Sequence, residues 1–149
     1  MMSSEKPSRE ILRVIDVNLN RVGEGLRLLE DIARLVLDDA ALTEELKTMR
    51  HELLAGDLEL NQQLLEARDS EGDVGIDIEA PGQGKERELP ALIMANSRRI
   101  QQALRVLEEM AKMPGVTLGL DSEKFKRARF NFYTMEKNLL ARLKHQGAD

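Results

Sequence analysis

The chain has 149 residues, and 22 Lys and Arg against 27 Asp and Glu leave a formal net charge of −5. This balance argues against a broad nucleic-acid-binding surface, which needs an excess of positive charge. The sequence contains no Cys, which excludes a disulfide framework, a thiolate metal site and a Cys nucleophile. No apolar run approaches the ~18 residues of a membrane span, and no secretory signal is recognisable. We therefore expect a cytoplasmic protein that binds neither nucleic acid nor membrane.

Four segments carry apolar residues at helical spacing, which predicts an all-α fold. The predicted helices cover residues 8–37, 42–66, 89–112 and 122–144. In the second, Gly56 and Asp57 indicate a kink or an interruption. Residues 68–87 are rich in Gly and acids and exceed an ordinary connection in length, so we expect them to form a functional loop. The length favours a single domain over residues 1–149.

The first and third predicted helices resemble each other. Residues 18–34 and 96–112 align at an offset of 78 with seven identities in seventeen positions. The partner helices match more weakly, at Leu46/Phe125 and Arg50/Arg129 with an offset of 79. Shared heptad spacing is an alternative explanation, but it does not account for a matched Asn at a core-facing position. The pattern predicts an antiparallel four-helix bundle made of two duplicated helical hairpins, joined by the long loop.

Polar residues interrupt the apolar stripe at matching places in the two copies. Asn18 lies about 20° from the centre of the stripe at Leu29, and Arg21 lies at its edge. Asn96 and Arg99 repeat this arrangement in the third helix. An Asn in a core stripe costs free energy unless its amide finds hydrogen-bond partners.

Two interpretations of these amides remain open. Asn18 and Asn96 form a buried pair that fixes the helix register, or they line a polar pocket between the helices. In the second case Gly25 and Ala103 leave room for a ligand.

Further charged residues are candidates for such a pocket. Arg50 and Arg129 lie at corresponding places in the partner helices, and Arg is suited to two-pronged capture of phosphate or carboxylate. Glu30 and Glu108 flank the stripe, where they would orient an Arg or accept a ligand's amino group. The opposite face, which includes Glu24, is typical of a solvated helix surface, with a subunit interface in a homo-oligomer as the alternative.

The loop begins with acidic residues next to a cation. Asp69 and Asp73 follow Arg68 in a Gly-containing stretch. Because Mg²⁺ is commonly held by one or two carboxylates plus substrate phosphate, this stretch suits a magnesium–phosphate site. A solvated acidic turn is the alternative.

Several motifs together resemble a small kinase family of thiamine biosynthesis. They are DVNLNRVGEGLR from position 16, LKTMRHEL from 46, RDSEGDVG from 68, NSRRIQQALRVLEE from 96, and Arg129 with Tyr133 and Glu136. The resemblance covers residues 13–139 and departs from the family pattern at Ile76, Gln102 and Asn131. Members occur alone or fused ahead of thiamine-phosphate synthase, and because no synthase barrel follows here, we expect a standalone member.

The resemblance implies a reaction. It is the transfer of the γ-phosphoryl group of ATP to 4-amino-5-hydroxymethyl-2-methylpyrimidine phosphate, with Mg²⁺ as cofactor and a functional link to thiamine-phosphate synthase. A phosphate nucleophile is already anionic, so the reaction needs cations more than a general base. We expect the catalytic residues to be Arg21, Arg68 and Arg99. The expected substrate-binding residues are Asn18, Glu24, Glu30, Arg50, Asn96, Glu108 and Arg129, and the expected metal ligands are Asp69 and Asp73.

Two other functions fit the same residues. One is a helical interaction or regulatory module that binds a thiamine-phosphate synthase. The other is an Arg-rich helical mutase that acts on an anionic metabolite and needs neither ATP nor Mg²⁺.

Overall fold

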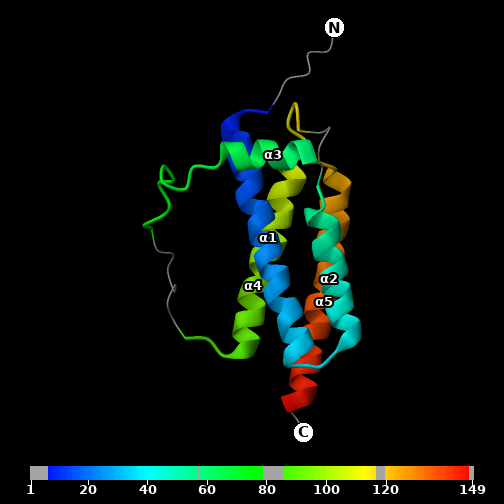
Figure 1. The fold of residues 1–149 in the computed structure, drawn as a ribbon. Coiled ribbons are helices and arrows are strands. Elements are labelled where there is room, and N and C mark those ends of the chain that lie inside the picture. The colour runs from blue at the N-terminus through cyan, green and yellow to red at the C-terminus, as the bar shows by residue number, and fades with distance from the viewer. Residues whose placement is uncertain (1–6, 57, 79–85, 117–119, 148–149) are drawn as a thin grey trace.

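The computed structural model describes residues 7–56, 58–78, 86–116 and 120–147, and within them the fold is all-helical. The helices are α1 (Arg9–Leu35), α2 (Ala40–Leu54), α3 (Leu58–Ala67), α4 (Leu89–Met110) and α5 (Ser122–Gly147). α1, α2, α4 and α5 lie side by side as a bundle, and the short α3 crosses one end of it (Figure 1). The all-α class is confirmed. Residues 79–85 of the predicted loop lie outside the described residues.

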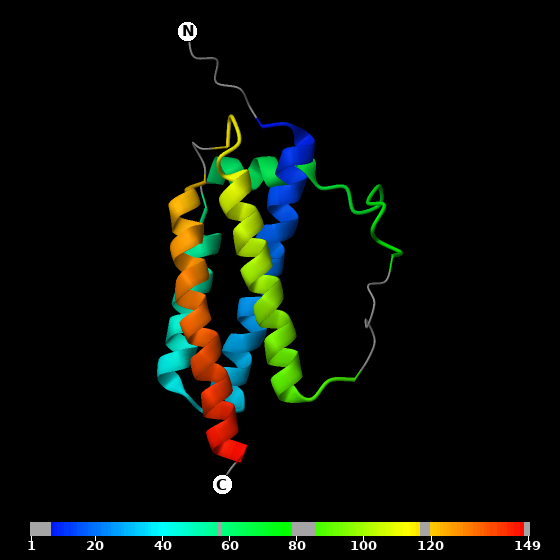
Figure 2. The same cartoon turned by 180° about the vertical axis from the view of Figure 1, so that it is seen from behind.

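Each bundle helix runs antiparallel to its neighbours. α1 packs against α2 and α4, and α5 packs against α4 and α2. α3 lies at one end of the bundle, and α4 begins at the opposite end (Figures 1 and 2). The arrangement is that of the predicted antiparallel bundle of two hairpins.

Side-chain caps explain where the first two helices begin. The Ser8 Oγ accepts a hydrogen bond from the Ile11 N–H at 3.2 Å, so α1 begins at Arg9. The Asp39 carboxylate accepts a hydrogen bond from the Leu42 N–H at 3.0 Å, and α2 therefore begins two residues earlier than predicted.

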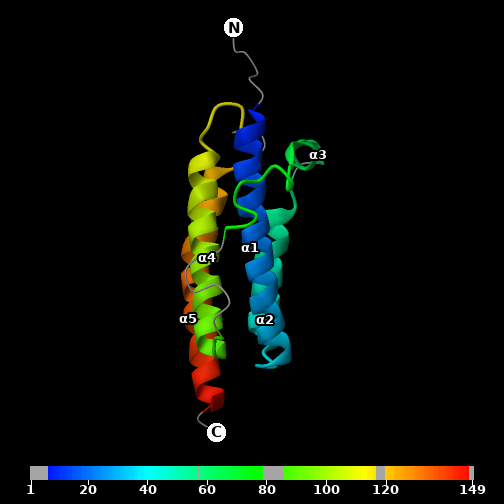
Figure 3. The same cartoon turned by 90° about the vertical axis from the view of Figure 1, so that its left-hand side faces the viewer.

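The segment predicted as one helix over residues 42–66 forms two helices, and the interruption expected at Gly56 is confirmed. The backbone leaves the helical region at Ala55, where ψ is 58°, and Gly56 follows. α3 runs across the end of the bundle instead of extending α2 (Figure 3). Its apolar residues cover that end of the core, and they are Leu60, Leu64 and Ala67.

α1 and α4 approach each other closely at Gly25. A Cβ atom at this position would lie 2.5 Å from the Ile100 Cγ1 atom. The Ile100 side chain therefore occupies the space that the glycine provides, and the expectation that Gly25 leaves room for a ligand is wrong. Ala103, the matching residue in α4, is also buried. None of the helices in the described part of the chain has the length and apolar character that crossing a bilayer requires.

Candidate functional site

Each hairpin contains a two-pronged ion pair at the same place. In the first, Arg50 on α2 donates from Nε and Nη2 to the carboxylate of Glu30 on α1, at 2.9 and 3.5 Å. In the second, Arg129 on α5 donates from the same two atoms to Glu108 on α4, at 2.5 and 3.1 Å. The side-chain exposures also agree, at 16% and 8% for Arg50 and Glu30 and 16% and 3% for Arg129 and Glu108. The repeated geometry supports the duplication inferred from the sequence.

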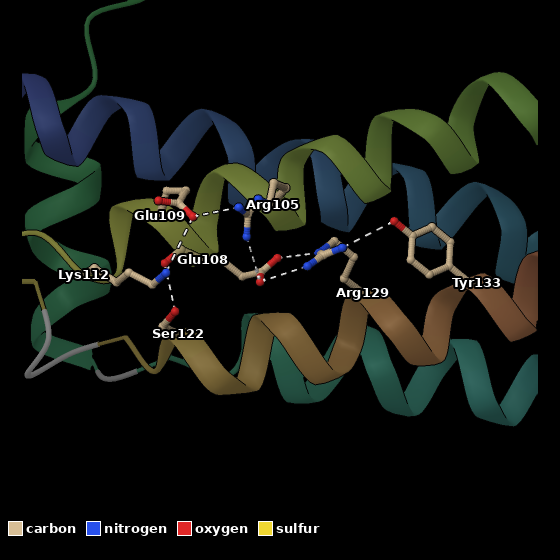
Figure 4. Close-up of polar contacts among 7 residues, drawn as sticks. All are labelled: Arg105, Glu108, Glu109, Lys112, Ser122, Arg129 and Tyr133. Carbon is tan, nitrogen blue, oxygen red and sulfur yellow. Dashed lines mark hydrogen bonds and ion pairs between the residues drawn. The ribbon is translucent and has the colours of Figure 1, made fainter.

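The second pair lies in a wider polar network between α4 and α5 (Figure 4). Burial raises the pKa of Glu108, but the hydrogen bonds and charge of Arg129, helped by Arg105, outweigh burial and lower it below its ordinary value. The pKa of Arg129 is raised, chiefly by its hydrogen bonds to Glu108 and Tyr133. Both groups are therefore ionised at neutral pH, and the guanidinium is held in one orientation.

Arg68 is held by a buried carboxylate that the sequence analysis missed. Its Nε and Nη2 atoms donate to Asp16 on α1 at 2.6 and 2.9 Å, and Asp16 is only 6% exposed. The hydrogen bond to Asp16 raises the pKa of Arg68. Asp16 lies about 140° from the apolar stripe on α1, so periodicity gave no sign of its burial. The available signal was its position as the first residue of the DVNLN motif.

Asp69 and Asp73 close turns in the loop. Asp69 accepts a hydrogen bond from the Gly72 N–H and Asp73 accepts one from the Gly75 N–H, both at 2.8 Å. An Arg9 guanidinium nitrogen lies 3.7 Å from the other oxygen of Asp69. Within the described residues no group of three or more His, Asp or Glu is placed to hold a metal ion by itself. Ionised carboxylates keep further lone pairs, so the two acids fit a Mg²⁺ that is held mainly by substrate phosphates.

The two asparagines are not paired with each other. Asn18 donates to the Val14 carbonyl at 2.8 Å, and Asn96 donates to the Leu92 carbonyl at 2.9 Å, each within its own helix. The interpretation as a register-fixing pair is therefore wrong. Asn18 is buried and its Oδ1 atom accepts a 3.5 Å hydrogen bond from Arg21, whereas Asn96 is half-buried.

The predicted arginines fall into two classes. Three are neutralised by a buried carboxylate, and they are Arg50, Arg68 and Arg129. Arg21 and Arg99 are exposed, and neither forms an ion pair with any described residue. Glu24 is also exposed and has no ion pair in the same part of the chain. The structure thus brings Glu30 to Arg50, Glu108 to Arg129 and Asn18 to Arg21, but it does not gather all five arginines into one cluster.

The face of α4 and α5 carries polar and aromatic groups that were not predicted as site residues. The Gln101 Nε2 atom donates to Glu136 at 3.1 Å, and the Arg129 Nη1 atom donates to the Tyr133 hydroxyl oxygen at 3.5 Å. Phe130 packs edge-to-face against Tyr133 with ring centroids 6.0 Å apart.

Hollows are also present elsewhere on the described surface. One runs along the exposed side of α2 and includes Lys47 and His51, and another lies between α2 and α5 beside Met49 and Met135. Neither is lined by a predicted site residue.

Comparison with known proteins places residues 13–138 within the ThiD2 family model. A thiamine-phosphate synthase of Rhodopirellula baltica is 47% identical over 106 residues, covering 70% of this chain and 28% of the relative. A thiamine-phosphate synthase of Nostoc sp. is 35% identical over 145 residues, covering 97% of this chain and 40% of the relative. The chain thus spans less than half the length of these relatives. No solved structure matches it significantly.

Proposed function

The chain belongs to the ThiD2 family, and from this premise we propose that it is a phosphotransferase of thiamine biosynthesis. Its similarity to thiamine-phosphate synthases supports the pathway. The proposed reaction moves the γ-phosphoryl group of ATP to 4-amino-5-hydroxymethyl-2-methylpyrimidine phosphate and yields the diphosphate. The observation that carries the proposal is the division of the arginines, because two exposed and uncompensated guanidinium groups occur at duplicated positions.

The reaction brings two polyanions together, so the main task of the protein is to hold them in line and offset their repulsion. Of the five predicted arginines, Arg21 and Arg99 are the two that form no ion pair with a described residue, so their charge is open for this task. Asn18 receives a hydrogen bond from Arg21, which orients that guanidinium from a buried position. An ionised phosphate attacks without a general base, so no carboxylate of the protein has to accept a proton in the proposed reaction.

The neutralised arginines support binding in a different way. Arg50 uses Nε and Nη2 on Glu30, which leaves Nη1 for a phosphate oxygen. Arg68 is oriented in the same way by Asp16 at the start of the loop. A guanidinium that is already fixed loses little side-chain entropy when a phosphate binds.

Mg²⁺ would be held by Asp69 and Asp73 together with ATP phosphates, and it would supply positive charge to the transferring group. Asp69 follows Arg68 directly in sequence and Asp73 lies five residues after it, so cations of two kinds would meet the phosphates there.

The test is ADP release by the purified protein with ATP, Mg²⁺ and the pyrimidine monophosphate. We expect turnover that requires all three. Helical protein that releases no ADP would contradict the proposal. Turnover of an anionic metabolite without ATP or Mg²⁺ would favour the mutase.

A second candidate is a module that assists thiamine-phosphate synthase, because the matching relatives carry this region within longer synthases. In that case Asn18→Leu would stabilise the fold without loss of function, since apolar replacement of a buried polar group can be favourable, and Asn96→Leu, at a half-buried site, would also leave function unchanged. A kinase would instead lose activity in both variants.

A further inference from the structure

The two hairpins differ at one matched place beside their ion pairs. Gly23 in α1 aligns with Gln101 in α4, and Leu54 in α2 aligns with Tyr133 in α5. In the first hairpin the Leu54 Cδ1 atom lies 2.8 Å from where a Cβ atom of Gly23 would stand, so this place is closed by an apolar contact. The fold therefore does not require the polar side chains that the second hairpin has there.

In the second hairpin Gln101 takes the place of Gly23 and pairs with Glu136, whose counterpart at position 57 lies outside the described residues. The Gln101 Nε2 atom donates to the Glu136 Oε1 atom at 3.1 Å, and both residues are half-buried. Tyr133 lies on the same face of α5, one turn before Glu136. Half-burial keeps part of each polar group open to a ligand while restricting its side-chain freedom.

An exposed aromatic pair lies on the same helix as Glu136, within the two turns before it. Phe130 and Tyr133 are 53% and 42% exposed, although the chain has only three Phe and one Tyr. Their rings pack at 70° to each other, and the Arg129 guanidinium carbon lies 4.8 Å from the Phe130 ring centroid. Aromatic side chains next to a few convergent polar groups are typical of sites that bind flat rings.

The hydrogen-bonding groups that Gln101 and Glu136 leave unused define which kind of ring they can bind. One N–H of Gln101 remains as a donor, and the carboxylate of Glu136 retains several acceptor lone pairs. An exocyclic amino group next to a ring nitrogen presents the complementary donor and acceptor. We propose that Gln101 and Glu136 recognise the amino edge of an aminopyrimidine ring, with Phe130 and Tyr133 beside the ring. This inference rests on the proposed function. Both proposed substrates carry this amino edge, the pyrimidine phosphate in its own ring and ATP in its adenine.

The experiment compares Glu136→Gln with the wild-type protein, with KM measured separately for the pyrimidine phosphate and for ATP. Losing the charged acceptor should raise one of the two KM values by roughly 10- to 100-fold, which is the usual effect of losing a hydrogen bond to a charged group. A higher KM for the pyrimidine assigns the site to that substrate, and a higher KM for ATP assigns it to adenine. Glu123→Gln, an exposed carboxylate in the first turn of α5, is the matched control and should change neither value.

A folded Glu136→Gln protein with both KM values within twofold of wild type would overturn the inference. Failure of the proposed function has a different signature, namely wild-type protein that releases no ADP. In that event calorimetric titration with the free aminopyrimidine alcohol and with ATP tests the site directly. Binding that weakens in Glu136→Gln supports the site without the kinase, and absence of binding to the wild type overturns it.

Discussion

The α1–α2 hairpin and the α4–α5 hairpin carry the same Glu–Arg pair in different surroundings. In the first, apolar packing of Leu54 on Gly23 lies beside the pair. In the second, Arg129 also contacts Tyr133, and the Gln101–Glu136 pair lies farther along the same face. A feature that occurs in both hairpins fits a role in holding two helices together, whereas one that occurs once requires another explanation.

The Asp16–Arg68 pair shows the opposite asymmetry, because here the polar contact belongs to the first hairpin. Asp16 in α1 is buried and bound to Arg68, while its counterpart in α4 is Met94, which is 43% exposed. The first hairpin therefore contributes the loop and its acids, and the second contributes the aromatic and amide groups. This division favours one composite site over two equivalent sites, which the arginine variants test, and the other variants test how far the two hairpins are alike.

Replacing Arg21 with Ala should give the largest effect. We expect diphosphate formation to fall by about 10³-fold or more, because arginines that offset transition-state charge in phosphoryl transfer contribute on that scale. Far-UV circular dichroism should remain that of wild type, since Arg21 is exposed. Steady-state ADP release is the measurement.

Arg99→Ala distinguishes one site from two. A composite site predicts losses of similar size in both variants, whereas two independent sites predict that each variant retains about half of the activity. Arg27→Ala is the control, because Arg27 is exposed and pairs with Asp31 on the solvated face. A fully active Arg21→Ala protein would remove Arg21 from the site.

Breaking the duplicated ion pair should give the next largest effect. Glu30→Ala and Glu108→Ala each leave a guanidinium that is 16% exposed without its partner, and loss of one member of a buried pair costs about 3–5 kcal/mol. Urea unfolding measures the change in the free energy of unfolding. Glu109→Ala, in which an exposed carboxylate is lost, should stay within about 0.5 kcal/mol of wild type. Unequal losses at Glu30 and Glu108 would break the proposed equivalence of the hairpins.

The helices could be predicted from sequence because their apolar spacing is regular and their caps are explicit. α1, α4 and α5 agree with the predicted ranges within three residues at each end. The break before α3 was signalled by Gly56, but its direction depends on tertiary packing of Leu60 and Leu64, which a local pattern does not contain.

The candidate site was less predictable for the same reason. The alignment of the repeats identified Glu30, Arg50, Glu108 and Arg129, and the expectation that each Glu orients an Arg is confirmed, but the sequence did not say which Arg each would bind. Burial of Asp16 depends on Arg68, which lies 52 residues away in sequence. Long-range pairing of this kind leaves no periodic signal along a helix.

Substitutions of two glycines in α1 should have a smaller effect on stability, and they compare the contact of α1 with α4 to its contact with α2. Gly25→Ala should destabilise the fold by about 1–3 kcal/mol, because the new Cβ atom would meet Ile100 at 2.5 Å inside the core. Gly23→Ala should cost less, because Leu54 is half-buried and the nearest atom is the end of its side chain. Thermal unfolding measures both. In a double-mutant cycle, Ile100→Ala should cost less in the Gly25→Ala background, and strict additivity would contradict the close contact.

Acid titration should give the smallest effect. The folded-state pKa of Glu108 is lowered, so its stabilising contribution is fully present above the ordinary Glu pKa of about 4.3 and is lost as pH falls through the lower folded value. Urea midpoints measured from pH 7 to pH 3 should therefore fall, and more gently in Glu108→Gln than in wild type. Part of the dependence of the urea midpoint on pH should persist in Glu108→Gln, because the Leu42 N–H and Arg142 also lower the pKa of Asp39. Glu109→Gln should keep the wild-type slope. If the urea midpoint of Glu108→Gln fell with pH as steeply as that of wild type, Arg129 would not hold this carboxylate in its charged form. The second hairpin would then lack the pair that relates it to the first.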